Sequence, residues 1–217
     1  MTEHDIKITI IYDNTTWLDS LDPDWGFSCL VEAFGTSILF DTGAHSRILY
    51  DNMNKLDIDP KEIDMVFISH DHWDHVDGLP GVLDINPDIK VYCPSSFSSI
   101  PSVNGIIKIN EAVKISPNIY STGELEGIEQ SLVINSRKGV TVVTGCSHPG
   151  VGTTLEASSK IGPVKNLIGG LHDFSDLPVL KPLEKICATH CTQYINEIKK
   201  WYPEKIIGGG AGRVIHL

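Results

Sequence analysis

Short apolar runs recur along the chain, and turn residues close each of them. Their length and their content of β-branched residues are typical of β-strands. The predicted strands cover residues 6–12, 28–34, 37–40, 65–69, 90–93, 131–135, 140–144, 164–168, 186–189 and 205–207. Strands therefore dominate both halves of the chain.

Helical patterns separate some of these runs. Residues 46–56 carry apolar side chains at near-helical spacing, and residues 153–161 form a weaker candidate. A third helix is predicted after Thr192, whose hydroxyl can cap it. Its apolar stripe comprises Ile195, Ile198 and Trp201 or Tyr202.

Strands in ladders in both halves, with helices between them, favour a layered α/β fold with two sheets over a simple doubly wound sheet. We find no sequence repeat and no linker rich in Ser, Pro or Gly, so we expect a single domain over residues 1–217. Residues 94–127 are rich in Ser, Pro, Asn and Gly, and we expect them to form an irregular insert or a loose edge.

Composition supports a folded core and constrains the partners. The 217 residues include 41% hydrophobic side chains, which distinguishes the chain from a disordered one. With 17 basic and 28 acidic side chains, the formal charge is −11 with histidine neutral. That balance argues against a nucleic-acid binder with a general basic surface, although it leaves room for a local basic groove.

The first seven residues are polar and lack the basic head and apolar run of a secretory signal. No uninterrupted apolar stretch approaches the roughly 18 residues that span a bilayer. We therefore expect a cytoplasmic protein without a membrane partner. The five cysteines are odd in number and include no CxxC pair, which favours free thiols over a disulfide framework.

The most informative segment follows the predicted strand 65–69 and reads His-x-His-x-Asp-His. It contains His70, His72, Asp74 and His75. If the strand ends at His70, the first two histidines point to the same side of an extended chain, and the last two residues enter a tight turn or a first helical turn. Three imidazoles and a carboxylate suit a zinc-type cation. A solvated histidine-rich loop is the alternative, and mutual repulsion of protonated imidazoles disfavours it.

Three further histidines follow predicted strands, where binding and catalytic residues concentrate. His148 follows strand 140–144 and His190 follows strand 186–189, so we expect both to bind metal; an exposed loop histidine is the alternative for each. His172 follows strand 164–168. One interpretation is a side chain that supports the ligands or is buried and hydrogen-bonded; the other, which the family resemblance described below implies, is a general acid or a phosphate contact.

Two other features allow more than one interpretation. The glycine-rich run 208–213 can cradle a phosphate through backbone N–H groups such as that of Gly209, with Arg213 supplying charge, but an ordinary turn before a last strand is favoured. Trp17, Trp25 and Trp73 can line a pocket for a flat substrate, although core packing is the more common role of such residues. His4, His45 and His216 lack such a setting, and we interpret them as structural.

The His-x-His-x-Asp-His segment, together with the upstream Asp-Thr-Gly at residues 41–43, resembles the metallo-β-lactamase-fold superfamily. The resemblance implies an αββα four-layer sandwich of two mixed sheets between helices, with one or two divalent ions, zinc by preference, at one edge. It also implies that His70, His72 and a later histidine hold one ion. Asp74, His75 and the last motif histidine, matched by His190, would hold the other.

The sequence departs from the broad superfamily pattern at Cys146, which stands where many members have a bridging aspartate in a Thr-Gly-Asp strand end. Cys146 is a thiolate ligand, a residue supporting the ligands, or a small buried side chain. Asp41 is expected to orient a metal-binding histidine and not to bind metal itself.

Several short sequence segments narrow the resemblance to one branch of the superfamily. These are residues 12–14, 24–28, 39–43, 145–150, 169–172 and 190–192. The branch comprises dihydropterin-ribofuranosylaminobenzene 5'-phosphate synthases, linked to methanopterin biosynthesis, and other metal-dependent hydrolases. The resemblance implies a hydrolase that uses a metal-activated water on a small anionic substrate, with Asp74 and His172 as catalytic residues. Alternatives are a pterin-condensing synthase and an iron redox or sensing protein. The last is disfavoured because oxygen-reducing di-iron relatives usually carry Glu in place of His72. The sequence predicts no oligomeric state.

Overall fold

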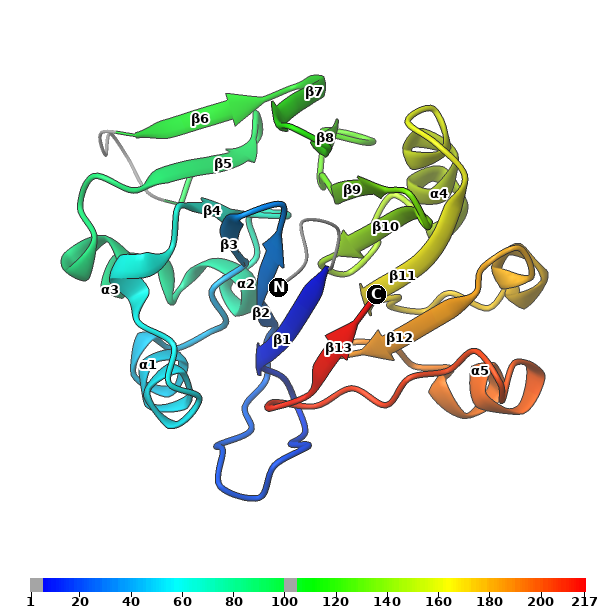
Figure 1. Cartoon of the computed structure of the whole chain (residues 1–217), viewed down its shortest axis with the longest axis horizontal. Coiled ribbons are helices and arrows are strands. Elements are labelled where there is room, and N and C mark those ends of the chain that lie inside the picture. Colours follow the sequence, from blue (N-terminus) through cyan, green and yellow to red (C-terminus); the bar gives the residue numbers. More distant parts are fainter. Residues whose placement is uncertain (1–5, 100–104) are drawn as a thin grey trace.

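The computed structural model describes residues 6–99 and 105–217, which excludes His4. Two β-sheets form the centre of the molecule (Figure 1). The first sheet contains β1 (Lys7–Tyr12), β2 (Ser28–Ala33), β3 (Thr36–Phe40), β4 (Met65–Phe67), β5 (Lys90–Pro94), β6 (Ile106–Ile109) and β13 (Val214–His216), in the order β13-β1-β2-β3-β4-β5-β6. The second contains β7 (Glu111–Ser116), β8 (Ile119–Gly123), β9 (Leu132–Ser136), β10 (Gly139–Thr144), β11 (Val164–Gly170) and β12 (Lys185–Thr189), in the order β12-β11-β10-β9-β8-β7.

Each sheet is mixed, and its parallel strands require crossover connections. Strands β3 to β6 are parallel in the first sheet, and β10 to β12 are parallel in the second. The helices are α1 (Ser46–Lys55), α2 (Trp73–Val76), α3 (Leu79–Ile85), α4 (Val151–Ser159) and α5 (Ile195–Trp201), with short 3-10 turns at Pro60–Glu62 and Leu177–Leu180. Helix α1 connects β3 to β4, and α4 connects β10 to β11, so these helices serve as crossovers.

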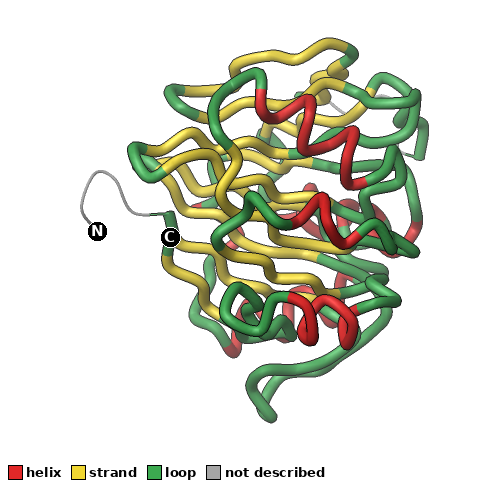
Figure 2. Tube along the Cα trace, turned by 90° about the vertical axis from the view of Figure 1, so that its right-hand side faces the viewer, coloured by secondary structure: helices red, strands yellow, loops and turns green. Residues whose placement is uncertain are grey.

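Three apolar clusters separate the layers. The cluster between the sheets includes Ile8, Phe40, Phe67, Ile134, Val143 and Ile168. On the outer face of the first sheet, Leu49 of α1 and Val82 of α3 pack with Val66. On the outer face of the second, Val151 of α4 and Ile198 of α5 pack with Leu167. Helices thus cover both outer faces of the paired sheets (Figures 1 and 2), which confirms the predicted αββα sandwich.

The prediction of an irregular insert at residues 94–127 is wrong, and the alternative of a sheet edge is nearer to the structure. Its described part forms β6, β7 and β8, which are edge or near-edge strands of the two sheets. Most side chains of β7 are exposed, so its sequence lacks the alternation of apolar and polar residues that marks a half-buried strand. The sequence pattern therefore fails where one side of the strand has no core to face.

Two predictions near the C-terminus also need correction. Residues 205–207 form only an isolated bridge to β12 through Ile206, while the last strand expected after the glycine-rich run is β13, which pairs with β1. Thr192 does not cap α5, because its hydroxyl donates to Thr189 O and accepts from Leu171 N–H. Helix α5 instead begins at Ile195, after Tyr194. No helix in the described part of the chain combines the length and hydrophobicity that a bilayer crossing requires.

Candidate metal centre

The site residues predicted from the sequence lie at one edge of the sandwich, at the carboxyl ends of parallel strands. Four residues in this region have a left-handed backbone, a conformation that non-glycine residues rarely adopt. These are Asp41 (φ 52°) after β3, Ser147 (60°) beyond β10, His172 (48°) beyond β11 and His190 (52°) after β12. Such local strain gathers at functional sites, where surrounding contacts hold it in place.

The His-x-His-x-Asp-His segment runs from an extended chain into the short helix α2, as predicted. His72 is the residue before the helix, and Asp74 and His75 lie in its first turn. His70 and His75 are fully buried, whereas His72 is exposed. Thr42 fixes the helix against β3, because its N–H and its hydroxyl both donate to His75 O, at 2.8 and 2.9 Å.

The second sheet supplies the remaining candidate ligands. His148 lies on the turn after β10 and His190 lies directly after β12. Gly145 permits the first of these turns to approach the segment that follows β4, since a Cβ there would lie 2.2 Å from Ser69 Oγ. Two clusters result, and each combines residues from both sheets. The ring centroids of His70 and His72 lie 4.8 and 4.7 Å from that of His148, and those of His75 and His190 lie 5.0 Å apart.

Asp74 joins the second cluster. Its Oδ2 atom lies 3.4 Å from His190 Nε2 and 3.9 Å from His75 Nε2. Trp25 Nε1–H donates to the same oxygen at 2.9 Å. Burial alone would raise the pKa of Asp74, but the two histidines lower it to about 2, so the carboxylate is ionised at neutral pH. The structure thus groups the predicted ligands as the sequence resemblance implies.

Cys146 lies between the two clusters. Its Sγ atom falls within 4.8 Å of donor atoms of His70 and His148 on one side, and of His75 and His190 on the other. The distance from Sγ to His75 Nε2 is 3.2 Å. Cys146 therefore lies where a ligand shared by two ions would lie. The thiol of Cys191 donates to Cys146 Sγ at 3.3 Å. The sequence analysis did not identify Cys191 as a site residue.

Hydrogen bonds fix which ring nitrogen of each histidine faces the clusters. The buried Asp41 carboxylate lies 2.7 Å from His75 Nδ1 and accepts from Ser69 N–H and Oγ–H, both at 2.7 Å. Since the Ser69 hydroxyl donates to Asp41, it accepts from His70 Nδ1–H at 2.8 Å. Both rings therefore carry their proton on Nδ1 and turn the Nε2 lone pair toward the centre.

Asn14 fixes which ring nitrogen of His190 faces the cluster, a role that the sequence analysis did not predict. Asn14 Oδ1 accepts from Gly26 N–H at 3.1 Å, so it also accepts from His190 Nδ1–H at 3.0 Å. The Asn14 amide in turn donates to His190 O. Asn14 follows β1, far from His190 in the chain, and a lone asparagine after a strand gives no local signal of this contact.

The donor set fits a divalent cation. The Nε2 atoms of His148 and His190 are buried and have no hydrogen-bond partner within the described structure, as expected for atoms that await a ligand. Burial, supplemented by neighbouring imidazoles, lowers the pKa of His70, His148 and His190, which favours the neutral form that binds metal. Burial also opposes charge on His75, but Asp41, Asp74 and Glu129 together raise its pKa.

His172 stands beside the first cluster. Its side chain is 43% exposed, and its ring centroid lies 5.1 Å from that of His148. This exposure disagrees with a buried His172, while its role as a substrate contact or as a support for the ligands stays a prediction. A cavity of about 290 Å³ adjoins both histidines and extends to Ser147 and Phe174. This hollow offers space for a substrate next to the candidate metal ligands.

The tryptophans are not core residues. Trp17, Trp25 and Trp73 are all about half exposed. Trp25 contacts the centre, since its ring lies 5.5 Å from that of His190. Trp17 lies away from the ligands, under the guanidinium of Arg213 at 4.0 Å. Gly209 packs against Thr189, where a Cβ would lie 2.4 Å from Oγ1. Phosphate binding by Gly209 and Arg213 therefore stays a prediction.

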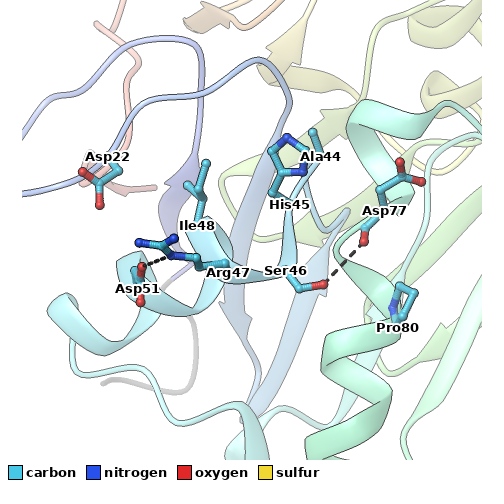
Figure 3. Close-up of a pocket in the computed structure, with 9 residues that line it drawn as sticks. All are labelled: Asp22, Ala44, His45, Ser46, Arg47, Ile48, Asp51, Asp77 and Pro80. Carbon is cyan, nitrogen blue, oxygen red and sulfur yellow. Dashed lines mark hydrogen bonds and ion pairs between the residues drawn. The ribbon is translucent and has the colours of Figure 1, made fainter.

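A separate hollow of about 900 Å³ lies beside α1 (Figure 3). Its lining includes His45, Arg47 and Asp77, with Asp51 next to Arg47. His45 is largely exposed, 3.8 Å from Asp24. The lining shares no residue with the two histidine clusters, so its size alone does not make it the reactive site.

Comparisons with known proteins agree with this geometry. A family model for the β-lactamase superfamily domain matches residues 36–157, more than half of the chain. A Methanocaldococcus jannaschii protein, 7,8-dihydropterin-6-methyl-4-(β-D-ribofuranosyl)-aminobenzene-5'-phosphate synthase, is 29% identical over 87% of this chain and 88% of its own. The crystal structure of a metal-dependent hydrolase of the β-lactamase superfamily superposes with a TM-score of 0.79 and 25% identity, covering 97% of this chain and 98% of that one.

More distant structures share the fold alone. A diphosphatase of the PhnP family superposes with a TM-score of 0.69 at 13% identity, covering 98% of this chain and 97% of its own. The short form of human tRNase Z superposes with a TM-score of 0.65 at 16% identity, covering 96% and 98%. With the family model, the fold and the arrangement of strand-end histidines in agreement, the chain belongs to the β-lactamase superfamily.

Proposed function

We propose that the protein is a metal-dependent hydrolase that uses a metal-activated water on a small anionic substrate. The observation that carries this proposal is the pair of histidine clusters that meet at Cys146, with two buried and unpartnered Nε2 atoms. His70, His72, Cys146 and His148 would hold one ion, and Asp74, His75, Cys146 and His190 the other. A zinc-type ion lowers the pKa of bound water to about 7 and polarises the bond under attack.

The residues around the clusters have distinct parts in such a reaction. Asp74 is ionised, and its Oδ2 faces the second cluster, so it can accept a proton there while Trp25 N–H holds it in place. His172 lies beside the first cluster, next to His148 and the adjoining cavity. There it can protonate a leaving group or hold an anionic group of the substrate.

Metal analysis followed by turnover measurements tests the proposal. The purified protein should contain zinc or another divalent ion and should hydrolyse at least one of a phosphodiester, a thioester and a lactone. His172→Gln should lower kcat without changing metal content, because His172 lies outside both ligand clusters. If the protein contains metal but turns over none of these substrates, the proposal of a hydrolase is contradicted.

A carbon–nitrogen condensing synthase of pterin-type cofactor biosynthesis is the second candidate. It is favoured by the synthase activity for which the Methanocaldococcus jannaschii relative is named, and that relative aligns over 87% of this chain. The half-exposed Trp25 ring beside His190 could also stack on a flat substrate. Amine-dependent consumption of a dihydropterin diphosphate, without hydrolysis of the other substrates, would support this reaction over hydrolysis.

A further inference from the structure

Two buried polar residues, Glu129 and Gln130, lie between β8 and β9, where the two sheets approach each other at the candidate metal centre. Gln130 binds the first sheet. Its N–H donates to Ser69 O at 2.9 Å, and its side-chain amide donates to Ile68 O at 2.8 Å. These carbonyls belong to the segment that leads into His70, so Gln130 is tied directly to the start of the first ligand motif.

Glu129 binds the second sheet through a full set of hydrogen bonds. One carboxylate oxygen accepts from four donors and the other accepts from a fifth. The donors to Oε1 are Thr144 Oγ1 (2.9 Å), Gly145 N (3.0 Å), Cys146 N (3.1 Å) and Ser147 N (3.1 Å), and the donor to Oε2 is His148 N (2.8 Å). Glu129 is 1% exposed, so these contacts replace the water that a carboxylate would otherwise keep.

The backbone around Glu129 has the form of an anion-binding nest. Successive N–H groups converge on one point, and Ser147 adopts the left-handed conformation with φ 60°. Here the protein's own carboxylate fills the nest. Because the turn carries both Cys146 and His148, the carboxylate fixes the direction of two candidate ligands at once.

The spacing between the sheets matters for the chemistry of the centre. Each cluster of candidate ligands takes residues from both sheets: His70 with Cys146 and His148, and His75 with Cys146 and His190. A shift of one sheet against the other would separate the ligands of both ions together. Adjacent residues that bind one sheet each are placed to prevent that shift.

We propose that Glu129 is a positioning residue of the metal centre: its carboxylate presets Cys146 and His148 for the ions, while Gln130 fixes their distance from His70. The inference rests on the proposed metal centre but not on the identity of the reaction. It assigns to Glu129 a role in metal binding that extends beyond holding the fold together.

Substitution of Glu129 by Gln, read out with cobalt(II), tests the inference. In E129Q one oxygen can still accept four donors, but an amide N–H₂ then faces His148 N–H, and the negative charge is lost. Supporting groups of metal ligands typically contribute roughly 10- to 100-fold in affinity, and we expect a loss in this range in competition with a chelator. The thiolate-to-cobalt charge-transfer band of Cys146 should weaken as well.

Thr144→Val provides a graded second variant, because it removes one of the five donors with little change in shape. We expect a smaller, several-fold loss of cobalt affinity and a measurable change in the same band. Asn166→Ala is the matched control. It removes a buried hydrogen bond to Thr141 Oγ1 within the second sheet, away from the ligands, so it should lower the melting temperature and leave the cobalt spectrum unchanged.

The outcomes separate the inference from the proposed function. Wild-type protein that binds neither cobalt nor zinc would contradict the proposed metal centre and with it the inference. If wild-type protein binds cobalt and both E129Q and T144V keep its spectrum and its cobalt affinity, the positioning role of Glu129 is overturned and the proposed metal centre still stands. If E129Q fails to fold, an unchanged T144V overturns that role, and a weakened T144V supports it.

Discussion

The two halves of the candidate metal centre are built in opposite ways. The first sheet supplies four ligands from one stretch of six residues, His70 to His75, which leaves β4 and turns into α2. The second sheet supplies Cys146 and His148 from the turn after β10 and His190 from the end of β12. A contiguous motif needs only a local turn to bring its ligands together, whereas the dispersed set depends on the pairing of β10, β11 and β12.

The supporting groups differ in the same way. In the first half, the fully buried carboxyl group of Asp41, whose pKa is raised by burial, holds His75 directly and His70 through Ser69. In the second half, the neutral amide of Asn14 holds His190. Asp41 thus orients two candidate ligands, whereas Asn14 orients one. The contiguous half should therefore tolerate the loss of its support less well, which can be measured.

The largest expected effect comes from removing one ligand in each half. We expect His70→Ala and His190→Ala each to abolish metal retention, because each takes a ligand from a different cluster. Metal content after dialysis is the measurement, and His216→Ala, at an exposed position on β13, is the control. Unchanged stoichiometry in either ligand variant would show that the corresponding assignment is wrong.

Asp41→Asn should produce the next largest effect. An amide N–H₂ in place of Oδ2 would face donors from both His75 and Ser69, so both rings of the first half lose their orientation. We expect roughly 10- to 100-fold weaker metal affinity, measured by chelator competition. Wild-type affinity in this variant would mean that Asp41 serves only the fold.

Asn14→Ala should weaken metal binding less, by roughly tenfold, since it removes a neutral acceptor from one histidine only. The same competition measurement applies. A larger loss for Asn14→Ala than for Asp41→Asn would reverse the ranking of the two halves and would point to the dispersed half as the more fragile one.

The pH dependence of stability tests the burial of both halves. The folded pKa of His70, His148 and His190 lies below 6.5, so their contribution to stability is complete above pH 6.5 and is lost as the pH falls toward the folded values. The raised pKa of His75 acts in the opposite direction but involves one residue. We expect the free energy of unfolding of metal-free protein, measured in urea, to fall below pH 6.5.

Both halves of the metal centre should contribute to this change of the unfolding free energy with pH. The double substitution His148→Gln and His190→Gln removes two of the three groups, so its unfolding free energy should vary less between pH 7 and 5 than that of wild type. The exposed His216→Gln serves as the control and should keep the wild-type slope. A slope unaffected by the double substitution would contradict the assigned burial.

The smallest expected effect concerns the contact between Trp25 and Asp74. Trp25→Phe retains an aromatic ring but loses the N–H that donates to Asp74 Oδ2. Because the indole is half exposed, we expect a several-fold loss in kcat/KM, about 1 kcal/mol, with metal content unchanged. An equal loss in Trp73→Phe, whose ring is similarly exposed, would show that the Asp74 contact is not the cause.

Local patterns predicted the buried part of the fold well. The strands that face the core on both sides, such as β1, β3 and β10, appear as continuous apolar runs, and the structure confirms them. The same reasoning failed at β6 to β8 and at Thr192. Most side chains of β7 face no core, and the buried β8 carries the polar Ser121 and Thr122 where apolar residues would mark a strand. The Thr192 hydroxyl bonds to Thr189 and Leu171 instead of capping a helix.

The sequence by itself determined the contiguous ligand motif, the strand-end position of His148 and His190, and the two-sheet α/β fold, because each depends on residues close together in the chain. Only the tertiary structure decided that Cys146 lies between both clusters, that Asn14 sets the tautomer of His190, and that the Glu129 carboxylate fills the nest formed by the turn after β10. These contacts join segments far apart in sequence, and their distances exist only once the two sheets have packed.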